Sequence, residues 1–245
     1  MYLSNRIATV FSAQGALATA AADGMERAGA TVHRADRAAA DVLDEAAIEH
    51  FLRRVHAKTG RIDVVFNGVG PRAAAAGTGT TSTALDYSAF TMGMDLIVGG
   101  QLLTARTAAR LWMEWGQTGT IVLLTSSLSR LKMPNATVIS TASAAVEGLA
   151  RTLAAEYGRH GIRVACVNGT AFPETETIRE TAALQARAAG IPAETMLEGM
   201  QQGYSLGRGP TLTEFGDLVA LLASDSGAIL NSHIIDADRG ALNVL

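Results

Sequence analysis

The chain has 245 residues and a formal net charge of −3, with 48% hydrophobic and 18% charged residues. This size and composition fit one α/β domain with a large core over residues 1–245. The weak negative charge gives no electrostatic basis for binding nucleic acid or an anionic membrane. A single cysteine, Cys166, excludes a disulfide framework, and the histidines show no metal-ligand spacing, so we expect no metal. Without a long apolar run or a leader-like start, we expect a cytoplasmic protein.

The first third of the chain predicts the opening of a dinucleotide-binding fold. Residues 6–11 are short and apolar, residues 16–28 have helical periodicity, and residues 31–35 form a second strand. The next helix begins near Asp44, after too few residues for a full crossover and another strand. We therefore expect a sheet that is shortened at the edge between its second and third strands.

The middle of the chain alternates strands and helices. Residues 62–66 predict a buried strand, and residues 71–83 predict a flexible loop of small residues at the mouth of a pocket. Residues 85–116 predict one long helix. Residues 120–125, 136–157 and 162–167 then predict a strand, a long alanine-rich helix and another strand. This alternation predicts a Rossmann-like, doubly wound parallel sheet in a single domain.

The last third predicts a lid and one further helix and strand. Residues 172–204 predict a helical lid that is broken near Pro192, with Met196 and Met200 on one face. An amphipathic helix follows at 211–224, and residues 229–237 predict the last strand. The whole pattern predicts six strands, or seven with one vestigial.

The segment AAVEGLARTLAAEYGRHGIRV, residues 144–164, closely resembles a helix and strand of the short-chain dehydrogenase/reductase family. The resemblance extends from Arg6 to Gly240. It implies NAD(P)-dependent oxidoreductase activity and tetramers that assemble through helices 85–116 and 136–158. Family members carry a Ser at the tip of the preceding strand, a catalytic Tyr thirteen residues later and a Lys four residues after that.

This chain keeps only the first of these three catalytic residues. Ser126 occupies the Ser position, whereas Ile139 and Ser143 occupy the Tyr and Lys positions. Leu96 stands where the family places an Asn in the long helix. The family Tyr transfers a proton and the Lys lowers its pKa, so the usual proton-transfer machinery is missing. Lys132 and Tyr204 are the remaining side chains that could reach the pocket and replace these groups. The simpler interpretation is that Lys132 is a solvated loop residue and that Tyr204 only belongs to the lid.

The resemblance also implies a cofactor turn with the pattern T-G-x-x-x-G-x-G, which lets the backbone approach a pyrophosphate. The matching residues are FSAQGALA, so Ser12, Ala16 and Ala18 occupy the glycine positions. Two interpretations of this turn remain: it only packs within the fold and binds no ligand, or it binds a dinucleotide weakly. The corresponding cofactor contacts, vestigial and weak at most, fall on Ser12, Gln14, Leu17, Asp36, Asp41, Val42, Asn67 and Gly68.

Asp36 follows the second strand, where the family places the acid that accepts from an adenosine ribose. It is also a plausible polar loop residue. If a cofactor binds, this carboxylate favours NAD over NADP, because a 2′-phosphate would meet a negative charge. With the glycines, the Tyr and the Lys all replaced, we expect no tightly bound dinucleotide.

Three hypotheses about function remain open from the sequence. The first is a redox-silent homologue that acts as a subunit of a homo-oligomer, or of a hetero-oligomer with an active paralogue. The second is a non-redox enzyme, such as a dehydratase, isomerase or cyclase, which uses the old pocket for a small molecule. The third is an atypical NAD-dependent oxidoreductase acting on a carbonyl or alcohol. The sequence names no substrate.

Overall fold

The computed structural model describes residues 1–202 and 204–241. Its described residues form one parallel sheet with the strand order β2-β1-β3-β4-β5-β6. The strands are β1 Ile7–Phe11, β2 Thr31–Ala35, β3 Val64–Asn67, β4 Thr120–Ser126, β5 Arg163–Gly169 and β6 Ile234–Ala237. The order reverses direction at β1, which confirms the predicted Rossmann-like, doubly wound fold.

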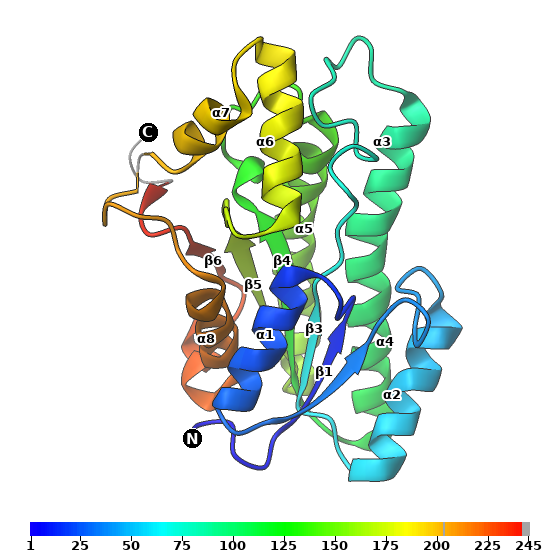
Figure 1. Cartoon of the computed structure of the whole chain (residues 1–245). Coiled ribbons are helices and arrows are strands. Elements are labelled where there is room, and N and C mark those ends of the chain that lie inside the picture. The colour runs from blue at the N-terminus through cyan, green and yellow to red at the C-terminus, as the bar shows by residue number, and fades with distance from the viewer. Residues whose placement is uncertain (203, 242–245) are drawn as a thin grey trace.

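Helices cover both faces of the sheet and its upper end (Figure 1). They are α1 Ala16–Arg27, α2 Glu45–Thr59, α3 Tyr87–Met94, α4 Gly100–Trp115, α5 Thr137–Tyr157, α6 Glu176–Ala189, α7 Ala193–Met200 and α8 Leu212–Ala223. One face is packed by α1 and α8, and the other by α2, α4 and α5. The short helices α6 and α7 stand beyond the carboxyl ends of the strands (Figure 1).

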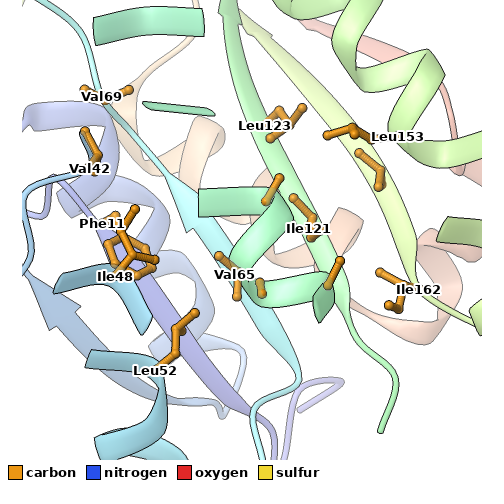
Figure 2. Close-up of a cluster of buried hydrophobic side chains, with 14 of the residues drawn as sticks. Phe11, Val42, Ile48, Leu52, Val65, Val69, Ile121, Leu123, Leu153 and Ile162 are labelled. Atoms are coloured by element: carbon orange, nitrogen blue, oxygen red, sulfur yellow. The ribbon is translucent and has the colours of Figure 1, made fainter. Parts of the chain in front are cut away.

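The hydrophobic core is divided by the sheet into two clusters. Figure 2 shows the cluster beneath α2, α4 and α5, where Phe11, Val65 and Ile121 from three neighbouring strands meet side chains such as Ile48. On the other face the packing is closer. A Cβ atom at Gly24 of α1 would lie 2.2 Å from the carbonyl carbon of Gly216 in α8. The small residues of α1 therefore allow two helix backbones to touch.

The predicted shortening of the sheet edge is confirmed. Residues 36–44 contain neither a strand nor a helix, so the chain passes directly from β2 to α2. The Asp44 carboxylate accepts the backbone N–H of Ala47 at 3.1 Å and caps α2. The sheet thus ends at β2 on this side, close to the turn that resembles the cofactor loop.

Two predicted elements are corrected. The last strand was expected over 229–237, but Asp225–Leu230 forms a 3₁₀ helix and β6 covers only Ile234–Ala237. Ile229 suggested a buried strand residue, yet its side chain is 84% exposed. The predicted helix over 85–116 is interrupted by a π-helical segment, Asp95–Gly99, between α3 and α4.

The π-helical segment is followed by a glycine, Gly100, that lies close to other parts of the chain. A Cβ atom at Gly100 would lie 3.1 Å from a methyl group of Val42 and 3.3 Å from one of Val69, so the backbone approaches its neighbours closely there. Apolar periodicity in the sequence does not reveal such a change of helix type. Among the described residues, no helix is both long and apolar enough to cross a membrane.

Candidate functional site

A cavity of about 780 Å³ lies at the carboxyl ends of the strands, beneath α6 and α7. Its floor contains the first turn at Gly15, the end of β4 at Ser126 and the end of β5 at Gly169. Its outer wall contains residues of the 71–83 loop and of the predicted lid. Ligands bind at this edge in open α/β sheets, where the strand order reverses.

The described lining of this cavity contains no charged side chain. Apart from its alanines, its apolar members are Leu17, Val69, Pro71, Ile97, Leu124, Leu128, Leu131, Met133, Ile139, Phe172, Ile178, Ile191, Met196 and Met200. The ionisable lining residue is Tyr204, and burial raises the pKa of its phenol. An ion placed here without a partner would lose its hydration at a cost of several kcal/mol. The cavity therefore suits uncharged molecules.

Ser126 lies where the sequence predicted it, at the end of β4 and in the cavity wall. Its hydroxyl oxygen accepts the backbone N–H of Leu128 at 3.2 Å. The hydroxyl hydrogen remains available to a ligand. Ser126 can therefore donate a hydrogen bond to an oxygen, but none of the described lining residues is a charged base beside it.

Ile139 and Ser143 also line the cavity, from the first turns of α5. Ile139 is half-buried and apolar, while Ser143 is only 3% exposed. The Thr125 hydroxyl donates to the Ser143 carbonyl at 2.8 Å and ties α5 to β4. Where family members carry the Tyr phenol and the Lys ammonium group, this wall carries the aliphatic side chain of Ile139 and the neutral hydroxyl of Ser143.

The turn between β1 and α1 has a left-handed backbone conformation at its first glycine position. Ser12 has a φ of 57°, the left-handed conformation that favours glycine. The Gly15 N–H donates to the Ser12 carbonyl at 3.0 Å and closes the turn. The strained serine costs roughly 1–2 kcal/mol relative to a relaxed backbone.

Ala18, the third glycine position, is fully buried and packs against Gly68. A Cβ atom at position 68 would lie only 2.7 Å from the Cβ of Ala18. The methyl group on α1 thus occupies space that a side chain after β3 would need. These two residues fit each other, so the turn is packed by protein atoms.

One feature of this turn favours an anion and two oppose it. The N-terminus of α1 has no side-chain cap and no acidic residue, so its N–H groups remain available at the cavity. Against this, Ala16 adds a methyl group at that terminus, and Leu17 reaches across to Gly169. The described lining offers no lysine or arginine to a pyrophosphate.

The predicted ribose contact lies outside the cavity lining. The Asp36 carboxylate accepts from the Gln14 amide at 3.2 Å and from the Ala39 N–H at 2.9 Å, so both of its oxygens have partners. Asp41 accepts from the Leu43 N–H and from Arg37, and the Leu43 hydrogen bond is the main cause that lowers its pKa. These residues stabilise the loop after β2.

The other predicted cofactor contacts divide between core and cavity. Val42 is buried against Gly100, and Asn67 donates to the Gly100 carbonyl at 3.0 Å and to the Thr104 hydroxyl at 2.9 Å. Both brace the sheet against α4. Ser12 also lies outside the lining, whereas Leu17 and Gly68 line the cavity.

The lid is held over the cavity by contacts that the sequence did not predict. The Glu180 carboxylate of α6 accepts the backbone N–H groups of Ala73 and Ala74, each at 3.3 Å. The Gln185 amide donates to the Pro134 carbonyl at 3.1 Å. The sequence predicted only a helical lid over 172–204. These bonds join α6 to the 71–83 loop and to the segment before α5.

Two further candidates from the sequence have different positions. Tyr204 lies in the cavity wall, 7% exposed, with its hydroxyl 3.4 Å from the Ala171 carbonyl. Lys132 is exposed and is not part of the lining. Among the residues that the structure describes, no three His, Cys, Asp or Glu side chains are grouped as metal ligands.

Known proteins that resemble this chain include dehydrogenases and a synthase. A family model described as enoyl-(acyl carrier protein) reductase matches residues 3–241. A (−)-isopiperitenol/(−)-carveol dehydrogenase of Mentha piperita is 30% identical over 95% of this chain and 86% of that protein. A (+)-cis,trans-nepetalactol synthase of Nepeta racemosa is 28% identical over 96% of this chain and 85% of that protein. The crystal structure of NAD+-bound xylitol dehydrogenase, 18% identical, shares the fold with a TM-score of 0.89 over 98% of this chain and 100% of that chain.

Proposed function

The chain belongs to the short-chain dehydrogenase/reductase family, and from that premise we propose a redox-silent member that binds a small uncharged molecule instead of a dinucleotide. The observation that carries this proposal is the large cavity whose described lining has no charged side chain. A dinucleotide brings a pyrophosphate into this site, and its charge would find no cationic partner. An uncharged molecule avoids that desolvation cost.

The residues at the old catalytic positions support the same proposal. Ile139 offers no proton, and Ser143 offers no positive charge to lower a neighbouring pKa. At the turn, Ala16 carries a methyl group at a position where the family's glycine leaves room for a phosphate. One relative is named a dehydrogenase and another a synthase. The hypothesis of a non-redox reaction of the dehydratase, isomerase or cyclase type stays open for this cavity.

The test of redox silence is stopped-flow measurement of NADH consumption with a panel of carbonyl compounds. We expect no turnover by the wild type, and little by Ile139→Tyr with Ser143→Lys, because the turn still opposes the cofactor. Adding Ser12→Gly, Ala16→Gly and Ala18→Gly is expected to produce measurable nicotinamide binding. Robust turnover by the wild type would overturn the proposal in favour of an atypical NAD-dependent oxidoreductase.

A second candidate function is a structural subunit in an oligomer of the family. The observation that favours it is a set of exposed apolar side chains on the helices of residues 85–116, namely Tyr87, Met92 and Met113. Exposed apolar groups mark an interface where they form a contiguous patch. Light scattering of the protein alone, and after co-expression with an active paralogue, tests this role. A monomer in both samples would reject it.

A further inference from the structure

The cavity connects two regions of the protein that lie far apart along the sequence. Residues of the first turn and of the segment after β3, such as Leu17 and Val69, line one part of it. Residues of the lid, such as Ile191, Met196 and Met200, line another part. Both parts belong to one space of about 780 Å³. A single ligand can therefore extend from the turn to the lid without leaving the cavity.

The sheet determines the width of this space. The lining includes residues at or just after the carboxyl ends of four neighbouring strands, in the order β1-β3-β4-β5, namely Gly15, Gly68, Ser126 and Gly169. Adjacent strands lie about 4.8 Å apart, so the first and the fourth of these strands are about 14 Å apart. A chain extends about 3.5 Å for every three bonds, so an extended skeleton of about a dozen bonds covers this distance.

The side chains beside the turn are apolar. Ala16 places a methyl group at the start of α1, and Val69 is buried under the segment that follows β3. The side chain of Leu17 reaches towards β5, because a Cβ atom at Gly169 would lie 3.4 Å from one of its methyl groups. At the place that the family resemblance gives to a dinucleotide, the side chains of this protein therefore offer hydrocarbon surface.

We propose that the ligand is one long, uncharged and mostly apolar molecule, which lies across the cavity from the first turn to the lid and fills the space that a dinucleotide would use. This inference rests on the proposed function and adds the size and shape of the ligand. A compact molecule would leave part of the apolar lining in contact with water. A longer molecule gains binding free energy from that surface as well, because burial of apolar area is favourable.

The first test is a series of straight-chain primary alcohols with six, eight, ten and twelve carbons. Each is titrated by calorimetry against the wild-type protein. Burial of each added methylene group should tighten binding roughly fourfold, and this gain should continue up to twelve carbons. A gain that stops at eight carbons would overturn the inference, because the longer probes would then find no further apolar surface.

The second test narrows each part of the cavity with a larger side chain. Leu17→Trp narrows the space beside the turn and Met196→Trp the space beneath the lid, since both side chains are half-buried and line the cavity. Each variant should weaken dodecanol binding roughly tenfold, which corresponds to about two methylene groups. Hexanol should bind each variant as it binds the wild type, because it can occupy the part that remains open.

A matched control separates blocking of the cavity from a general effect of the added ring. Leu221→Trp makes the same change on α8, at a side chain that is 41% exposed and outside the lining. It should change the binding of neither hexanol nor dodecanol. Urea unfolding checks that each variant is folded, and the chain-length series on the wild type does not depend on any variant.

The outcomes also separate this inference from the proposed function beneath it. Unchanged dodecanol binding in either Leu17→Trp or Met196→Trp would overturn the spanning ligand and leave the uncharged-ligand proposal standing. No binding of any alcohol, or displacement of dodecanol by micromolar NADH, would overturn both. A gain that continues to twelve carbons, together with loss in both narrowed variants, supports both.

Discussion

The turn between β1 and α1 and the lid of α6 and α7 border the same cavity, yet they hold together in different ways. The turn is closed by the backbone hydrogen bond from Gly15 to the strained Ser12, and the helix that follows is packed against the sheet through Ala18 and Gly68. The lid is fixed by hydrogen bonds from side chains to backbone, through Glu180 and Gln185. Protein side chains fill the space beside the turn, whereas the lid covers the cavity without filling it.

This difference explains how a cavity persists where the cofactor turn has changed. Small apolar contacts at Ala18 stabilise the fold without any ligand, because buried methyl groups contribute about 0.8 kcal/mol each. The lid has few buried apolar residues, and of its two anchors Glu180 is half-exposed while Gln185 is buried. Regions of this kind open at low free-energy cost. The lid is therefore the expected route for ligand entry.

The largest expected effect comes from breaking the packed pair in the turn. Gly68→Ala places a Cβ atom 2.7 Å from the Cβ of Ala18, and should lower the free energy of unfolding by about 1–3 kcal/mol. Adding Ala18→Gly should restore most of this loss. Urea unfolding of both single variants and the double variant measures the coupling. If the changes in unfolding free energy of the two single variants simply add in the double variant, the two residues do not compete for this space.

An intermediate effect is expected at the lid. Glu180→Gln removes the charge that accepts the N–H groups of Ala73 and Ala74, and should speed ligand dissociation about fivefold. Amide hydrogen exchange should rise in residues 71–83 while the global unfolding free energy changes little. Glu194→Gln, on the exposed face of α7, is the matched control. Equal exchange rates in the two variants would contradict a role of Glu180 as an anchor.

The smallest effect is expected at the bend of the turn. Ser12→Gly should raise the free energy of unfolding by about 1 kcal/mol, because glycine adopts a φ of 57° without strain. It should not by itself create dinucleotide binding, since Ala16 and Ala18 remain. Urea unfolding checks the first expectation and an NADH titration checks the second. A less stable variant would show that the Ser12 side chain makes a stabilising contact.

The sequence predicted the fold well because buried strands and helix periods are local signals. Residues 31–35 and the capped helix at Thr211 correspond to their elements closely, and the missing crossover after β2 followed from chain length alone. The last strand was misjudged because Ile229 is apolar but exposed, which no local pattern distinguishes. The π-helical segment was also missed, because apolar periodicity does not distinguish one helix type from another.

The site was predictable only where the family resemblance fixes a residue's position along a strand or helix. Ser126, Ile139 and Ser143 were placed in one wall by the resemblance, and the structure brings them to one cavity. The pairing of Ala18 with Gly68, and of Glu180 with Ala73, joins segments far apart in the chain. A single sequence carries no signal for such pairs. The uncharged lining is likewise a property of the assembled walls.

The central claim is that this cavity takes an uncharged molecule in place of a dinucleotide. The most direct measurement is calorimetric titration of the wild-type protein with NADH and, in a parallel sample, with dodecanol. The account predicts no NADH dissociation constant tighter than millimolar, together with measurable dodecanol binding. A low-micromolar dissociation constant for NADH would contradict it.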